Sequence, residues 1–434
     1  MPIHLKIFIA LLLSFVIGLI SNLQASHLDP LPDWFIVLSE TCNFFGTLFL
    51  NGLKMIVIPL VMTSILCGVA RIGAEKDFGR LGGKTIFLYA LTGLLAVSTG
   101  LMFVNLLEPG KVDESVKEQI LGSLNNNHAS KVEGAIENAE NGLENLLHIF
   151  HRMVPTNIFK AAVEGQLLGL IFFSLLFGYF ISKLPADAKD LQIRFWESFN
   201  SVILGITKFI ISFAPYGVFA LVTPTIMQVG LDTLWVMGSF ALTVVAGLAF
   251  HALIILPLLL RFFGGISFIQ HYRAMTPALL TAFSTASSSA TLPLTMNCLQ
   301  NRVGASKKIS GFTLPLGATI NMDGTALFEC VVVVFLAQIF GIEMGWVTQA
   351  SVVLLALLTS IGVAGIPSAS LVAIIVILQS TGFPEAVIAM GVGIVLVVDR
   401  ILDMLRTSIN VLGDSCVAVI IGKSEGETDY YQNQ

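Results

Sequence analysis

Five polar side chains recur at helical spacing in an otherwise apolar stretch near the end of the chain: Asp399, Asp403, Arg406, Asn410 and Asp414. At about 100° per residue they fall within an arc of roughly 80° on one helix face. Charges inside a bilayer cost roughly 2.5–3.5 kcal/mol each on insertion scales, so they usually mark function. The stripe therefore predicts a hydrated site that binds a charged solute and cations. The alternative is a set of structural ion pairs between helices.

The composition is that of a protein that crosses a membrane several times. The 434 residues are 55% hydrophobic and 12% charged, with a mean hydropathy of +0.86, which soluble domains do not reach. No basic patch suggests a nucleic-acid partner. The five cysteines have neither disulfide nor metal-ligand spacing. The apolar run after Lys6 could be a signal peptide, but in a chain this apolar we expect a first transmembrane helix.

Long apolar segments divide the chain into expected membrane spans. They cover roughly 4–24, 42–70, 83–107, 157–183, 197–228 and 233–263, and less regular regions follow at 266–340, 344–383 and 385–422. Lysine and arginine gather after the even-numbered crossings, so both termini are expected to be cytoplasmic. The stretch 108–144 carries eight acidic residues and three lysines, and we expect it to face outward.

Signatures of soluble enzymes are missing from the sequence. It has no P-loop and no glycine-rich dinucleotide motif, and its seven histidines are isolated, with no pair at zinc spacing. The missing P-loop disfavours an ATP-driven pump and leaves coupling to an ion gradient. We therefore expect no enzyme activity and no cofactor. An intramembrane enzyme is a distant alternative, because no nucleophile and base are paired.

The first of three interruptions in the C-terminal half is the hydroxyl-rich run 281–293, which ends in Pro293. Serine and threonine compete for backbone partners and proline removes a donor, so the run is not expected to form a regular helix. Its apolar flanks predict a re-entrant hairpin whose tip offers N–H and hydroxyl donors to a carboxylate. Close packing of small residues between helices is an equal alternative.

Two further interruptions follow. Asn321, Asp323 and Gly324 break an apolar segment, and small residues surround Pro367 in the stretch 360–370. Unwound backbone in a membrane is tolerated where it is buried in protein or lines a cavity. Its carbonyls, with Asp323, suit a hard cation, although a structural kink is the alternative. The stretch around Pro367 predicts a second re-entrant hairpin. Broken segments at corresponding positions of two repeats point to a transporter binding site.

These motifs resemble the glutamate/aspartate:cation symporter family, which includes the neuronal excitatory amino acid transporters and their prokaryotic homologues. The resemblance rests on three long, ordered stretches. They are Ser287-Ser288-Ser289 with Thr291-Leu292-Pro293, residues 314–325, and residues 403–414. Residues 54–60, 154–157 and 214–220 also fit, so it covers nearly the whole chain.

The resemblance implies an all-α polytopic membrane protein. It would have eight transmembrane helices plus two re-entrant helical hairpins, arranged as inverted repeats in an elevator-type homotrimer. The expected divisions are scaffold helices 1–2 (1–82), transport-domain helix 3 (83–107), an extracellular loop with the start of helix 4 (108–156), scaffold helices 4–5 (157–228), transport-domain helix 6 (229–265), hairpin 1 (266–303), broken helix 7 (304–341), the gating hairpin 2 (342–383), helix 8 (384–422) and a cytoplasmic tail (423–434).

The resemblance also implies which residues hold the substrate. Asp403 would bind the ammonium and Arg406 the side-chain carboxylate as a bidentate fork. The hydroxyls of hairpin 1 and Asn410 would bind the α-carboxylate, while Thr325 and the hairpin 2 tip would complete the site. The full set is Ser287, Ser288, Ser289, Thr325, Gly365, Ile366, Ser370, Asp403, Arg406, Thr407 and Asn410.

Three sodium sites are implied in the same way, with Na⁺ as the coupling ion. The first would use Gly317, Asn321, Asn410 and Asp414. The second would use Thr319, Met322, Ser360, Ile361 and Val363. The third would use Tyr89, Thr92, Asn321 and Asp323.

Three positions indicate the transported solute. Within the family, C4-dicarboxylate relatives lack the acid at Asp403, neutral amino acid relatives lack a counterpart of Arg406, and proton-coupled bacterial relatives often have asparagine at Asp414. The resemblance thus implies Na⁺-coupled uptake of L-aspartate or L-glutamate. The short loops favour a bacterial inner membrane. The alternatives are an H⁺-coupled C4-dicarboxylate or glutamate symporter of the same fold, or an anion-conducting channel; a channel could not concentrate its solute.

The sequence departs from the family at three positions. Archaeal relatives have arginine at Ala286, and neuronal relatives have one at Met404; the nearby guanidinium in this chain is Arg400. We therefore do not carry over gating behaviour or potassium counter-transport. Gly93 replaces a serine or threonine, so the third sodium site lacks a hydroxyl that relatives have.

Overall fold

The computed structural model describes residues 3–25, 28, 31–72, 79–111, 154–163, 167–229, 232–362, 370–428 and 430–431, and within these ranges it contains helices and no strand. The predicted all-α class is therefore confirmed. The first helices are α1 (Ile3–Ala25), α2 (Asp33–Ile72), α3 (Gly79–Leu107), α7 (Ile158–Val163), α8 (Leu167–Ser182), α9 (Ala186–Ser212) and α10 (Ala214–Val229).

The remaining helices carry the interruptions seen in the sequence. They are α11 (Asp232–Phe250), α12 (Leu256–Leu259), α13 (Phe268–Thr285), α14 (Ser288–Cys298), α15 (Lys307–Ile320), α16 (Asp323–Phe340), α17 (Trp346–Gly362), α18 (Ser370–Ser380) and α19 (Glu385–Ser424). Among the described residues, Arg80–Leu107, Trp235–Gly264 and Lys307–Phe340 are long and apolar enough to cross a membrane. The eight-span topology stays a prediction.

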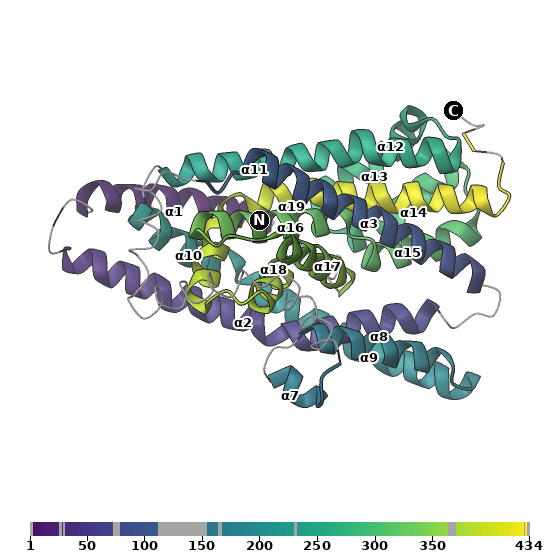
Figure 1. The fold of residues 1–434 in the computed structure, drawn as a ribbon, viewed down its shortest axis with the longest axis horizontal. Coiled ribbons are helices and arrows are strands. Elements are labelled where there is room, and N and C mark those ends of the chain that lie inside the picture. Colours follow the sequence, from purple (N-terminus) through teal and green to yellow (C-terminus); the bar gives the residue numbers. More distant parts are fainter. Residues whose placement is uncertain are drawn as a thin grey trace.

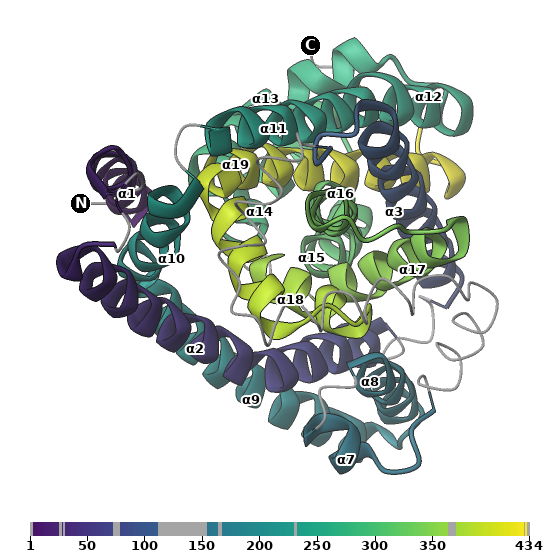
Figure 2. The same cartoon turned by 60° about the vertical axis from the view of Figure 1, so that its left-hand side comes forward.

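The helices gather in two groups (Figure 1). In the first, α1 packs on α10, and α2 packs on α8, α9 and α10. In the second, Figure 2 shows α15 and α16 in the middle of a bundle, with α3, α17, α18 and α19 around α16. The groups meet where α10 contacts α19 and where α2 contacts α17 and α18.

The break between α13 and α14 is shorter than the sequence predicted. The hydroxyl-rich run was not expected to form a regular helix, but only Ala286 and Ser287 leave the helix. Thr281 and Thr285 donate their hydroxyls to carbonyls one turn earlier, so these groups are satisfied without unwinding the helix. Ala286 has a φ of 48° and ends α13. Ser287 then caps α14 by accepting a hydrogen bond from the Ala290 N–H.

The second break lies where the sequence placed it. Asn321 and Met322 separate α15 from α16. Every residue of α16 except Gln338 is buried in protein, which is the condition under which polar groups and unwound backbone are tolerated in a membrane. The second predicted hairpin corresponds to α17 and α18; its tip, residues 363–369, lies outside the described residues.

The residues after α19 return to the bundle as a C-terminal strap, defined as residues 425–428 with 430–431. Glu425 pairs with Arg80 at 2.6 Å and with Lys84 at 2.7 Å, both in α3. Tyr431 reaches the two ends of the α13–α14 hairpin. Its N–H donates to the Val303 carbonyl at 2.8 Å, and its hydroxyl lies 2.8 Å from His271 Nδ1. The strap thus joins α3 to that hairpin.

We expect Glu425→Gln to lower stability slightly and in a pH-dependent way. Hydrogen bonds from Lys84 and Arg80 hold the pKa of Glu425 below its usual value of 4.5. Because this pKa is lower in the folded protein, the carboxylate contributes stability above about pH 4.5, and the contribution is lost as the pH falls through the lowered pKa. Partly exposed pairs contribute less than about 1 kcal/mol. Thermal unfolding from pH 7 to pH 3 should show the two proteins converging at the acidic end. A constant difference would contradict this.

Candidate functional site

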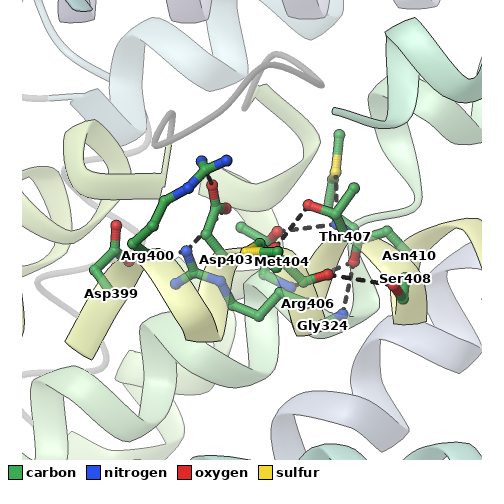
Figure 3. Close-up of polar contacts among 11 residues, drawn as sticks. Gly324, Asp399, Arg400, Asp403, Met404, Arg406, Thr407, Ser408 and Asn410 are labelled. Carbon is green, nitrogen blue, oxygen red and sulfur yellow. Dashed lines mark hydrogen bonds and ion pairs between the residues drawn. The ribbon is translucent and has the colours of Figure 1, made fainter. Parts of the chain in front are cut away.

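Two arginines and two aspartates of α19 form one buried ion-pair cluster. Arg406 Nη2 donates to Asp399 Oδ1 at 2.9 Å and to Asp403 Oδ1 at 3.0 Å. The Arg406 guanidinium also lies 3.6 Å from the ring centre of Phe328, a cation–π contact. Arg400 Nη1 lies 3.6 Å from Asp403 Oδ2. Figure 3 shows the Asp403 carboxylate between the two guanidinium groups. The four charges cancel, which makes their burial tolerable.

Asn410, one turn after Arg406, binds the start of α16. Its Oδ1 accepts hydrogen bonds from the N–H groups of Gly324 at 2.8 Å and Thr325 at 3.4 Å. Its Nδ2 donates to the Thr325 hydroxyl at 3.1 Å and to Met322 Sδ at 3.3 Å. The first N–H groups of a helix have no partner within it, so Asn410 satisfies donors that the break exposes. The structure therefore brings the predicted residues Thr325, Met322 and Asn410 together.

The close approach of α16 to α19 depends on Gly324. A β-carbon at this position would lie 2.7 Å from the carbonyl oxygen and 3.0 Å from the Cα of Arg406. Both are backbone atoms, which a side-chain rotation cannot move away. The contact places the start of α16, with the partial positive charge of its N–H groups, against the turn of α19 that carries Arg406.

A second polar cluster brings together oxygen-bearing side chains from α3, from the end of α15 and from α19. Thr92 in α3 donates to Asn321 Oδ1 at 3.0 Å, and Asn321 Nδ2 donates to Asp414 Oδ1 at 3.0 Å. The Asp414 carboxylate and the Tyr89 hydroxyl both lie against Gly317 and leave no room there for a β-carbon. All five residues are buried. The structure thus brings together predicted members of the first and third sodium sites.

Asp323 lies beside this cluster and is fully buried. Its Oδ1 has no hydrogen-bond partner among the described residues, and a β-carbon at Gly93 would lie 3.8 Å from that oxygen. A side-chain hydroxyl at position 93 would therefore lie near that carboxylate. In the described part of the chain, neither Asp323 nor Asp414 pairs with a lysine or arginine. Two buried carboxylates without a lysine or arginine partner in this part of the structure, among amide and hydroxyl oxygens, fit a hard cation such as Na⁺.

The other predicted residues are placed less completely. Ser288 is buried and Ser289 exposed at the start of α14, and no hydrogen bond joins either to Asn410. Ser370 is buried with its hydroxyl unpartnered among the described residues. The Thr407 hydroxyl donates to the Asp403 carbonyl.

For the second sodium site, the Thr319 and Ser360 hydroxyls donate to their own helices, and Ile361 lies in the last turn of α17. Val363, Gly365 and Ile366 lie outside the described residues. This site stays a prediction.

Comparison with known proteins decides the family. A family model described as the sodium:dicarboxylate symporter family matches residues 3–424, which is nearly the whole chain. The chain belongs to the sodium:dicarboxylate symporter family.

Named members of the symporter family are similar over most of their length. The proton/glutamate-aspartate symporter of Escherichia coli K12 is 31% identical over 96% of this chain and 93% of its own. The proton/sodium-glutamate symport protein of Geobacillus stearothermophilus is 32% identical over 97% and 94%. An excitatory amino acid transporter of Caenorhabditis elegans is 34% identical over 87% and 80%. The family is one of transporters, so the prediction that the chain is not an enzyme is confirmed.

Two buried titratable side chains near the site were not singled out from the sequence. Glu329 in α16 accepts a hydrogen bond from the Thr359 hydroxyl at 2.9 Å, and its Oε1 has no partner among the described residues. His251, treated as one of seven isolated histidines, places Nε2 3.4 Å from Asp323 Oδ2. A glutamate within an apolar segment is itself a functional signal in a membrane protein. Nothing local in the sequence indicates the His251 contact.

Proposed function

We propose that this symporter-family protein couples the inward movement of L-aspartate or L-glutamate to Na⁺. The observation that carries the proposal is the electrostatic balance of the two clusters. The cluster of Asp399, Asp403, Arg400 and Arg406 is neutral, so an acidic amino acid brings a net negative charge into a buried site. Asp323 and Asp414 lie nearby, and among the described residues neither pairs with a lysine or arginine, although His251 contacts Asp323. Cations that neutralise these carboxylates would also stabilise the anionic solute, so each ligand favours binding of the other.

In this proposal Asp403 holds the substrate ammonium and Arg406 its side-chain carboxylate. The free Nε and Nη1 of Arg406 support that role, because neither has a hydrogen-bond partner among the described residues. Guanidinium donors that have no partner in the protein are available to a bound carboxylate. Asn410, with Ser288 and Ser289, holds the α-carboxylate.

The finer architecture belongs to the same proposal. The group of α1, α2, α8, α9 and α10 would be the scaffold, and the bundle around α15 and α16 would be the mobile transport domain of an elevator. The helical pairs α13–α14 and α17–α18 would be the two re-entrant hairpins of an eight-span homotrimer in the bacterial inner membrane, with both termini cytoplasmic. The packing of the helices in two groups supports this division.

Sodium is the coupling ion that the oxygen cluster favours. The Escherichia coli relative is named for protons alone, whereas the Geobacillus relative is named for both protons and sodium. Proton coupling is the second candidate, and Glu329 is the observation in its favour. A buried carboxyl whose Oε1 has no hydrogen-bond partner among the described residues could carry a proton.

We expect Asp414→Asn to raise the Na⁺ concentration for half-maximal aspartate uptake by about tenfold or more. The substitution keeps the shape of the side chain but replaces an anionic ligand with a neutral amide; a contact between charged groups contributes about 1.5–3 kcal/mol, and 1.4 kcal/mol is tenfold. Ser415→Ala, at the neighbouring buried position, serves as the matched control. An unchanged Na⁺ dependence in Asp414→Asn would remove this residue from the cation site.

The proposed function is tested by accumulation of labelled L-aspartate in liposomes that contain the purified protein, under an inward Na⁺ gradient. A symporter raises the internal aspartate above the external concentration. A channel only equilibrates the two, and that result would overturn the proposal.

A further inference from the structure

Arg400 lies in the substrate cluster but has no part in the proposed binding of the solute. The family positions that carry a guanidinium near the ammonium-binding aspartate hold Ala286 and Met404 in this chain. Ala286 is the left-handed residue at the end of α13 and offers no polar side-chain group. Arg400, one turn before Asp403 on α19, is the side chain that brings a second positive charge to this carboxylate.

The two arginines are held very differently. Arg406 makes two hydrogen bonds of 2.9 and 3.0 Å to carboxylates and lies over an aromatic ring. Arg400 is also buried, with 7% of its surface exposed. Its nearest carboxylate contact is 3.6 Å, which is longer than a hydrogen bond. Its Nε and Nη1 have no hydrogen-bond partner among the described residues. A buried guanidinium with unsatisfied donors costs free energy, so the protein gains little by holding Arg400 where it is.

We propose that Arg400 is a specificity-determining residue that acts as a tethered counter-ion of Asp403. Its guanidinium neutralises Asp403 when no substrate ammonium is present and yields that carboxylate to the ammonium when an amino acid binds. The inference rests on the proposed function, because it takes Asp403 as the partner of the ammonium. It explains the loose contact, since a counter-ion that must be displaced cannot be bound tightly.

The counter-ion has a consequence for ligands that lack an ammonium. Succinate has the two carboxylates of aspartate without the amino group. With Arg400 present, succinate can bind while Arg400 stays on Asp403, and no carboxylate is left unpaired. Without Arg400, bound succinate would leave the Arg406 guanidinium shared between Asp399, Asp403 and the solute, whereas the ammonium of bound aspartate would still neutralise Asp403. Removing Arg400 should therefore weaken succinate binding more than aspartate binding.

The test compares dissociation constants for L-aspartate and succinate in saturating NaCl, using purified protein and competition against labelled L-aspartate. In wild-type protein, succinate is expected to compete measurably. In Arg400→Gln, the preference for aspartate over succinate should increase by at least about tenfold, which corresponds to the loss of one contact between charged groups. Arg400→Met is a second neutral variant of similar length. Arg400→Lys keeps the charge and should retain the wild-type ratio within about threefold.

A double-mutant cycle shows whether Arg400 acts through Asp403. In an Asp403→Asn background, the dissociation constant for succinate should be the same with Arg400 and with Arg400→Gln. Labelled succinate measures it directly. A loss of succinate binding that persists in that background would mean that Arg400 attracts the dianion directly, and it would overturn the inference. An unchanged preference for aspartate over succinate in Arg400→Gln would also overturn it. So would a failure of succinate to bind the wild-type protein. Wild-type protein that fails to bind L-aspartate in NaCl would overturn the proposed function, and the inference with it.

Discussion

Replacement of Arg406 by alanine is expected to reduce L-aspartate uptake by at least about hundredfold. The side chain is fully buried, and it is the group best placed to bind the second carboxylate of an acidic amino acid. Loss of a buried, hydrogen-bonded charge partner costs about 2–5 kcal/mol, and hundredfold corresponds to about 2.7 kcal/mol. Initial rates of labelled aspartate uptake in liposomes measure the effect.

The matched control for that substitution is Arg261→Ala, because Arg261 is exposed and lies outside the cluster. It should transport like the wild type. Size-exclusion and thermal-unfolding profiles separate loss of binding from loss of fold. A second readout is binding of L-serine, which has no side-chain carboxylate and should lose much less affinity than aspartate in Arg406→Ala. Wild-type aspartate uptake by Arg406→Ala would exclude the proposed role.

Substitution of Gly324 by alanine is expected to lower both stability and uptake, although it adds a single methyl group. The new β-carbon would lie 2.7 Å from the Arg406 carbonyl oxygen, and α16 would have to move away from α19. Overpacking of this kind typically costs about 1–3 kcal/mol. The movement would also weaken the 2.8 Å hydrogen bond from the Gly324 N–H to Asn410. We expect a lower Tm and at least about tenfold less uptake, since 1.4 kcal/mol is tenfold.

Gly311 provides the control for Gly324 in the other half of the same broken helix. It lies in α15 and is exposed, and a β-carbon at this position would have no atom of another residue within 4 Å beyond its immediate helical surroundings. Alanine is favoured over glycine in a helix by about 1 kcal/mol, so Gly311→Ala should be neutral or slightly stabilising. Equal effects of the two substitutions would show that helix propensity, and not the contact between α16 and α19, determines the result.

Helical periodicity was enough to predict that Asp403, Arg406 and Asn410 share one face of α19. The positions of the breaks after α13 and after α15 could be predicted because small residues, serine and asparagine cannot all be accommodated in a regular helix, whereas the predicted break around Pro367 lies outside the described residues. The extent of the first break could not. Thr281 and Thr285 satisfy their hydroxyls within α13, and propensity alone does not distinguish this outcome from an unwound segment.

Contacts between distant segments account for what the sequence did not show. The partner of Glu329 is Thr359, thirty residues later, and His251 meets Asp323 across seventy-two residues. The Arg406 guanidinium of α19 lies over the ring of Phe328 in α16, seventy-eight residues earlier. Each of these contacts exists because α16 is enclosed by its neighbours, and no local pattern encodes that arrangement.

The most direct test of Na⁺-coupled aspartate uptake compares two ion gradients in matched liposomes that contain the purified protein. Labelled L-aspartate uptake is measured with an inward Na⁺ gradient at equal pH, and with an inward proton gradient in sodium-free buffer, at the same membrane potential. For a Na⁺-coupled symporter we expect accumulation with the Na⁺ gradient and none with the proton gradient alone. Accumulation driven by protons without sodium would contradict it, and would mean that Asp323, Asp414 or Glu329 carries H⁺ in place of the cation assigned to this site.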